Sequence, residues 1–280
     1  MAPVLALRAS LLAALLLTAT AAGGAPRPVL HGANFWVKCY FSHVSSDDPI
    51  VYPRHPGWSH SHTFFGNRGT DAFSTPASLR AGKTNCKAKA DRAAYWVPTL
   101  SFKGQPVRPA SIGVYHKMKT TDVIHPFPAG LRMVAGNSGA RRPQDLDITY
   151  WTCWMSRGPS SAIPTCPSKP LGFDGRLSYL TLHVVFPDCW DGKHLDSRDH
   201  HSHMAYSDYG TCPRSHPLQV PGLQYVIAYP ILGGQGVTLS SGSPFSAHGD
   251  FMNGWDEKAL ARFVARCTAP GAKAGCADGA

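Results

Sequence analysis

Three short segments of the chain concentrate the residue types that most often carry chemistry near neutral pH. The chain has 14 histidines, and six of them lie in segments 59–62, 199–203 and 248–250. Imidazole is a common metal ligand and a common proton donor or acceptor at physiological pH. These segments are therefore the first candidates for a site.

The first segment reads Ser-His-Ser-His. In an extended backbone His60 and His62 point to the same face, where two imidazoles can share a metal or one can orient the other. The alternative is a polar surface turn. The last segment repeats this spacing with His248 and Asp250, separated by Gly249. That glycine would allow either a close approach of backbone or an unusual dihedral.

The middle segment reads Asp-His-His-Ser-His. His200 and His203 would share a face on a helical turn, whereas His201 and His203 would do so on a strand. Asp199 could ligate a metal or fix the tautomer of an imidazole. The alternative is a solvated loop.

We predict that the three segments converge in one cleft, because buried imidazoles and carboxylates need partners. The candidate catalytic residues are His60, His62, His200, His203, Tyr206, His248 and Asp250. The candidate metal ligands are His60, His62, His203 and Asp199, and the candidate sugar-stacking residues are Trp58, Trp190 and Trp255. For Trp255 alone, core packing is the stronger expectation.

Imidazole with carboxylate suits zinc or copper. Glu257 is the only glutamate, so a glycosidase with two carboxylates would have to use aspartates or Glu257. Chemistry based on histidine or a metal is favoured over that arrangement, which stays open.

Short runs of apolar and aromatic residues, separated by proline and glycine, predict a mainly β protein. The clearest run is 179–186, where Leu180, Leu182, Val184 and Phe186 share one face. One helix is expected after Asp256, with an apolar stripe of Leu260, Phe263, Val264 and Cys267. We expect a disulfide-bonded β-sandwich or jelly-roll-like domain with long loops and a short C-terminal helix.

Residues 1–24 are typical of a secretory signal peptide, with Arg8, an apolar run and then small residues. We therefore expect a secreted protein with one domain over 25–280, no membrane span and a monomeric state. The eight cysteines then predict four disulfides. Proximity in sequence suggests Cys153–Cys166, Cys189–Cys212 and Cys267–Cys276.

The net charge of +10 favours anionic partners such as acidic polysaccharides or cell-wall polymers. The positive charge is scattered, so no dedicated nucleic-acid groove is expected. General solubility is the alternative reading of this charge.

Several motifs occur together in one order: Asp48-Pro49-Ile50-Val51, Ser59-His60-Ser61-His62, Tyr95 to Leu100, Phe186 to Gly192, Asp199 to Tyr206 and His248 to Asp256. This pattern resembles a family of secreted fungal and bacterial proteins, the domain of unknown function DUF1996. The resemblance covers residues 33–267 and implies one compact, secreted domain. Some members are joined to WSC-type modules, which implies a carbohydrate or cell-wall context. A departure from the family pattern is Gly57-Trp58 before the first histidine motif, which leaves the local groove shape open.

Three functions compete at this point. The first is a lyase or hydrolase acting on extracellular polysaccharide through a His/Asp cleft that can hold a metal. The second is a non-catalytic protein that binds glycan or cell wall. The third is a secreted nuclease or phosphodiesterase, which the absence of a basic run disfavours.

Overall fold

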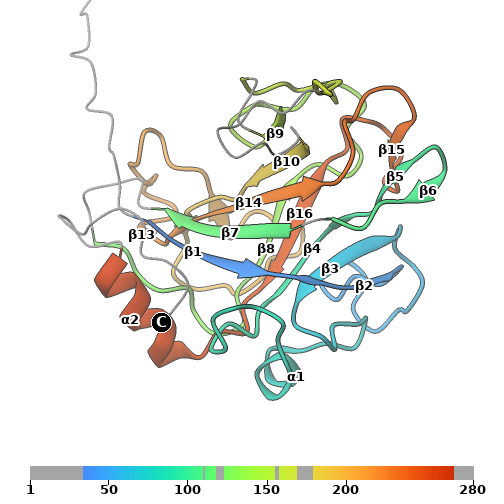
Figure 1. The fold of residues 1–280 in the computed structure, drawn as a ribbon. Coiled ribbons are helices and arrows are strands. Elements are labelled where there is room, and N and C mark those ends of the chain that lie inside the picture. Colours follow the sequence, from blue (N-terminus) through green and yellow to red (C-terminus); the bar gives the residue numbers. More distant parts are fainter. Residues whose placement is uncertain (1–33, 110, 118–122, 155–157, 169–178, 268–280) are drawn as a thin grey trace, which may run out of the picture.

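The computed structural model describes residues 34–109, 111–117, 123–154, 158–168 and 179–267 (Figure 1). The expected signal peptide lies outside these residues. No helix within the described ranges is long and apolar enough to cross a membrane.

Two five-stranded antiparallel sheets form the body of the fold (Figure 1). The first sheet, in spatial order, contains β1 (Asn34–Cys39), β7 (Ser111–Lys117), β14 (Gly222–Tyr229), β10 (Leu180–Val185) and β9 (Thr149–Cys153). The second contains β2 (Phe41–Ser45), β3 (His62–Gly66), β4 (Ala94–Pro98), β16 (His248–Met252) and β8 (Arg132–Gly136). This arrangement confirms the predicted mainly β, disulfide-bonded fold with a short C-terminal helix.

Shorter elements complete the described structure. One small sheet contains β12 (Met204–Ala205), β11 (Cys189–Trp190) and β13 (Leu218–Gln219), and the other contains β15 (Val237–Leu239), β5 (Leu100–Phe102) and β6 (Gln105–Pro106). The helices are α1 (Pro76–Ala81) and α2 (Glu257–Cys267).

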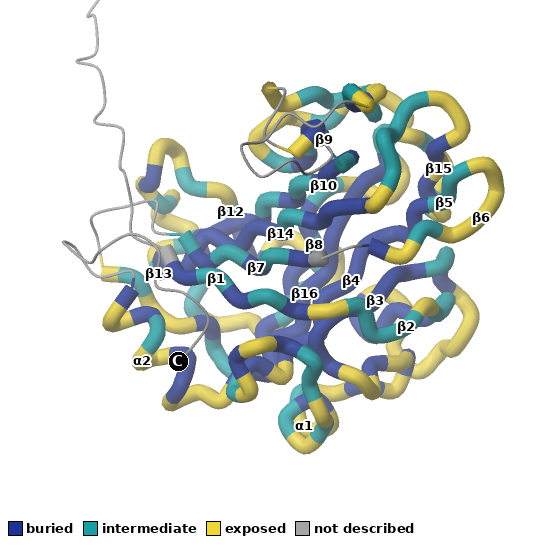
Figure 2. The backbone as a smooth tube through the Cα atoms, in the orientation of Figure 1, coloured by how far each residue is buried: buried dark blue, intermediate teal, exposed yellow. Residues whose placement is uncertain are grey.

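The main core lies between the two large sheets, whose strands in Figure 2 are mostly buried or half-buried. On β10 the predicted face is confirmed, since Leu180, Leu182 and Val184 are fully buried. Gly249 of the second sheet packs closely against the first, because a Cβ atom there would lie 3.1 Å from both Tyr225 and Val184. Its φ is not positive, so this glycine serves close packing and not an unusual dihedral.

Helix α2 begins as predicted. The carboxylate of Asp256 accepts a hydrogen bond from the amide of Ala259 at 2.8 Å, which caps the first turn. Phe263 stacks on Phe35 of β1 at 5.3 Å. Helix α1 was not predicted, although Thr75 and Ser78 form a reciprocal capping box at its start. Its six residues are too few to show a helical period.

Three disulfides join described residues: Cys39–Cys86, Cys153–Cys166 and Cys189–Cys212. The last two confirm pairs expected from proximity. The first was not predicted, because its 47-residue separation leaves no local signal. The expected Cys267–Cys276 pair includes a residue outside the described part of the chain.

Asp91 is a fully buried carboxyl group next to this long-range disulfide. Tyr95 donates its hydroxyl proton toward it at 2.8 Å, and the amide of Ala93 donates at 3.1 Å. Burial nevertheless raises the pKa of Asp91 to about 7. The folded state therefore holds this proton far more tightly than the unfolded state does.

This raised pKa makes the free energy of unfolding fall as the pH rises. A carboxyl group whose pKa is raised on folding contributes stability below its unfolded pKa, and this contribution is lost as pH rises to the folded value. For Asp91 the loss spans about pH 4 to about pH 7 and amounts to about 4 kcal/mol. Asp91→Asn carries no titrating proton, so its free energy of unfolding should lack this fall. Urea denaturation at both ends of the window checks this, and identical pH slopes for the two proteins would contradict it.

Candidate functional site

The first and third histidine segments meet on the outer face of the second sheet. On β16 the side chain of Phe251 enters the main core, so His248 and Asp250 project from the opposite face. His62 begins β3 on that same face. A second, smaller apolar cluster lies there as well, and it consists of Ile50, Phe64, Leu79, Ala94, Trp96 and Met252.

The strand pairing explains why residues far apart in sequence meet. Strands β3 and β16 are the two neighbours of β4. His62 is paired with Pro98 of β4, and Asp250 is paired with Trp96. Two residues further along the second ladder, His248 comes level with Pro98 as well. Because His62 and His248 are both level with Pro98, their imidazoles lie close together across β4.

Three imidazole rings are in contact at this place. The ring centroids of His60 and His62 are 4.2 Å apart, and those of His60 and His248 are 5.0 Å apart. Nε2 of His60 lies 3.2 Å from Nε2 of His248. The same-face expectation for His60 and His62 is thus realised, with His248 as the third member. One ligand nitrogen from each ring lies within 4.8 Å of the others.

Backbone carbonyls determine which nitrogen of two rings carries the proton. Nδ1 of His62 lies 3.0 Å from the carbonyl oxygen of Asp47, and Nδ1 of His248 lies 2.8 Å from that of Ser246. A carbonyl oxygen only accepts, so both Nδ1 atoms are donors and each neutral ring keeps a lone pair on Nε2. Nε2 of His62 is buried and has no hydrogen-bond partner among the described residues.

Two buried carboxyl groups adjoin the three rings. Oδ2 of Asp250 lies 3.9 Å from Nε2 of His248 and accepts no hydrogen bond within the described chain. Asp48 was not predicted as a site residue, yet a ligand oxygen of Asp48 and one of Asp250 lie within 4.8 Å of each other and of a His62 nitrogen. The Asp48 carboxylate also accepts from the amides of Ile50 and Val51.

Burial controls the ionisation of this cluster. It lowers the pKa of His60, lowers that of His62 far more, and lowers that of His248 to about 4. The neighbouring imidazoles lower the pKa of His62 further. Burial also raises the pKa values of Asp48 and Asp250. The rings are therefore neutral at physiological pH, and His62 and His248 each keep a lone pair on Nε2.

The segment between Asp48 and His60 folds back over the site. The side chain of Asp47 accepts from the amide of Gly57 at 3.1 Å, and the amide of Ser59 donates to the carbonyl of Ser46 at 3.1 Å. These bonds leave Trp58 at the surface, 66% exposed, where it stacks on His55. An exposed aromatic side chain thus stands two residues before His60.

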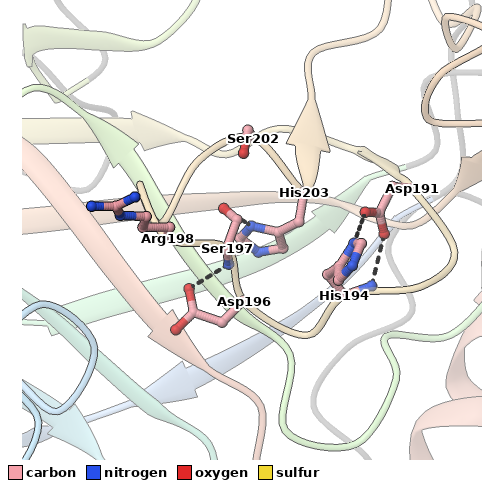
Figure 3. A pocket seen from close by; sticks show the side chains of 7 residues that line it. All are labelled: Asp191, His194, Asp196, Ser197, Arg198, Ser202 and His203. Carbon is pink, nitrogen blue, oxygen red and sulfur yellow. Dashed lines mark hydrogen bonds and ion pairs between the residues drawn. The ribbon is translucent and has the colours of Figure 1, made fainter.

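The middle segment is placed differently. Nε2 of His203 lies 2.7 Å from the carbonyl of Arg132 on β8, and its Nδ1 lies 2.9 Å from the Ser197 hydroxyl. His203 lines a pocket of about 630 Å³ (Figure 3). Its other lining residues are Asp191, His194, Asp196, Ser197, Arg198 and Ser202. None of the three clustered imidazoles lines this pocket.

His200 connects the two groups. Its Nδ1 pairs with Asp196 at 2.9 Å, and a positive charge on its ring would lower the pKa of Asp48. His201 is exposed at the surface. The middle segment therefore contacts the edge strand β8 through His203, and His200 is its member that interacts with Asp48.

The expected metal ligands do not all lie together. His60 and His62 are grouped with His248, whereas both nitrogens of His203 already have partners. Asp199 is exposed, and its Oδ1 accepts from the amides of His201 and Ser202, which fixes the loop.

The aromatic candidates also lie in different environments. Trp255 is 1% exposed and packs edge-on against Phe35, so it lies in the core, which was the stronger expectation for this side chain. Trp190 donates its indole proton to the carbonyl of His194 at 2.7 Å. Tyr206 donates its hydroxyl proton to the carbonyl of Val185 at 3.0 Å, and burial raises its pKa.

Comparison with known proteins gives one match. The family model described as "Domain of unknown function (DUF1996)" matches residues 48–255. The matched region starts at Asp48 and includes all of the clustered imidazoles. No curated protein and no solved structure matches the chain.

Proposed function

This chain belongs to the DUF1996 family, and we propose from its own residues that it cleaves an acidic polysaccharide outside the cell. The cleavage site is the cluster of His60, His62, His248 and Asp250. The proposal rests on one observation above all, namely that ionisable groups from distant segments meet, and that Nε2 of His62 and Oδ2 of Asp250 have no hydrogen-bond partner among the described residues. Buried polar atoms without partners are rare in folded proteins, and a catalytic role or a bound ligand is one explanation for them.

The charge of the protein supports an anionic substrate. The chain carries 27 Lys and Arg against 17 Asp and Glu, and a positive surface field attracts polyanions such as uronic-acid polymers. Trp58 and Tyr52 are exposed on the segment that leads into His60. Their rings are suited to stack on the apolar face of a sugar ring.

Elimination suits this cluster better than hydrolysis by two carboxylates. In a glycosidase the two carboxyl groups flank the sugar at about 5–5.5 Å or about 6.5–9.5 Å. Asp48 and Asp250 have oxygens within 4.8 Å of each other, and both side chains are almost completely buried. They cannot lie on opposite sides of a glycosidic bond.

In such an elimination the uronate carboxylate is neutralised and a base removes the proton from the adjacent C5 carbon. The electron pair of that C–H bond forms the C4–C5 double bond. The bond from C4 to the glycosidic oxygen breaks, and this oxygen stays on the neighbouring sugar as a hydroxyl that takes up the proton the base removed from C5. No oxidant is needed. His60 is the half-buried member of the cluster, so the sugar approaches from its side.

The test is a screen of the purified protein against polyuronates and neutral glucans. Ultraviolet absorbance follows the new double bond, and a reducing-end assay follows any hydrolysis. We expect double-bond formation on at least one polyuronate. Reducing ends without absorbance would replace the lyase with a hydrolase. Binding without any product would favour a non-catalytic glycan-binding protein.

A further inference from the structure

We propose that His60, His62 and His248 together hold a divalent transition-metal ion through their three Nε2 atoms, with the Asp250 carboxylate beside it. Zinc is the ion that this set of donor atoms suits best. The inference deepens the proposed function by naming the source of positive charge at the site, but ion binding itself does not depend on the substrate.

The spacing of the nitrogens fits an ion. Zinc–nitrogen bonds are about 2.0–2.1 Å long, so two nitrogens on a tetrahedral zinc are about 3.3 Å apart. Nε2 of His60 and Nε2 of His248 are 3.2 Å apart. Small rotations of the side chains are enough to bring the third ring, already within 4.8 Å, to the same ion.

The orientation of the buried rings is the second argument. Ligating histidines usually donate their other N–H to a carbonyl or carboxylate, which fixes the tautomer. His62 and His248 both do so, through Asp47 and Ser246. His62 is 0% exposed and its Nε2 has no partner among the described residues, so a ligand on that atom would satisfy it.

The carboxylate supplies the compensating charge. Oδ2 of Asp250 lies 3.9 Å from Nε2 of His248 and is likewise unpartnered within the described residues. A cation at the rings would favour the ionised form of this buried group. It would also replace the cost of an unpaired buried carboxylate by an attraction.

A bound ion would supply two things that the proposed reaction needs, namely a charge that neutralises the uronate and a base. Three imidazoles on the ion leave an open fourth position, as in catalytic zinc sites. The ion can neutralise the uronate carboxylate. A water bound beside the carboxylate would make the ion five-coordinate, as catalytic zinc can become, and its pKa would be lowered to about 7, so it could act as the base while the rings remain ligands.

A competing cluster does not offer the same chemistry. Cys39, Cys86 and Asp91 also lie within 4.8 Å of one another. The two cysteines form a disulfide, so no thiolate is available there. The imidazole group is thus the better metal site among the described residues.

The experiment measures binding of zinc and cobalt to the purified, disulfide-intact protein without any polysaccharide. After chelation and dialysis, calorimetry with zinc should give one site per chain. Cobalt should give the visible absorption of a low-coordinate nitrogen-ligated ion. His60→Ala, which alters the half-buried ring, should weaken zinc binding by at least about tenfold. His62→Gln and His248→Gln should do so more strongly.

His183→Ala is the matched control, since His183 is half-buried on the other sheet, and it should bind zinc as wild type does. Equal affinity in His60→Ala, His248→Gln and wild type would overturn the assignment, and so would the absence of any bound zinc, cobalt or copper. Circular dichroism checks the fold of each variant, and His60→Ala decides the outcome if a buried variant does not fold. One bound ion without cleavage of any polysaccharide would leave the metal site standing and remove the proposed function.

Discussion

His60→Ala is expected to lower the rate of polysaccharide cleavage by about two to four orders of magnitude, the usual effect of losing an acid–base group or its equivalent. His60 is the half-buried ring of the cluster, and its Nε2 lies 3.2 Å from that of His248. Its removal leaves the two buried rings and their carbonyl bonds in place. The rate of product formation on the best polyuronate from the screen measures the effect.

His203→Ala separates the two histidine groups. Its nitrogens contact the Arg132 carbonyl and the Ser197 hydroxyl, so its loss should loosen the pocket wall and leave most of the cleavage rate. His183→Ala controls for removal of a half-buried imidazole elsewhere. A loss with His203→Ala as large as with His60→Ala would instead place the reaction in the pocket of the middle segment.

Local pattern was enough to predict much of the fold. Alternation predicted the buried face of β10, and a capping aspartate with an apolar stripe predicted α2. Both signals lie within a few residues of one another in sequence. Helix α1 escaped because it is short. Strands β3 and β16 were not predicted by their bounds, because each begins with a polar residue, His62 or His248.

Most residues of the site could be predicted from the sequence, but their arrangement in space could not. Spacing of two residues shows that His248 and Asp250 share a face, but it does not reveal that β3 and β16 are both neighbours of β4. That pairing brings His62 and His248 together. Asp48 was missed for the same reason, because its place beside Asp250 depends on how the segment after β2 folds over the sheet.

The middle segment shows the opposite case. Three histidines and an aspartate suggested ligands, yet the exposed Asp199 fixes its own loop through backbone amides. Such local bonds between an aspartate side chain and following amides are common in turns. Residue type alone does not separate this role from metal ligation.

Removing the Cys39–Cys86 disulfide is expected to cause the largest loss of stability among the three bridges that join described residues. This bridge closes 47 residues, against 13 for Cys153–Cys166. Loop-closure entropy in the unfolded chain then gives about 4 kcal/mol for the first and about 3 kcal/mol for the second. Both cysteines of the longer bridge are also fully buried in the main core, so the double alanine variant loses packing as well.

The comparison of Cys39→Ala/Cys86→Ala with Cys153→Ala/Cys166→Ala measures this difference by urea denaturation at fixed pH. The long bridge ties the end of β1, an edge strand of the first sheet, to the segment before β4, the central strand of the second sheet. Its loss lengthens the unconstrained chain that leads into β3, which carries His62. We therefore expect metal binding and unfolding midpoint to fall together in the first variant, and the second variant to keep the metal site. A greater loss of stability in the second variant would contradict the entropic account, because loop length favours the first.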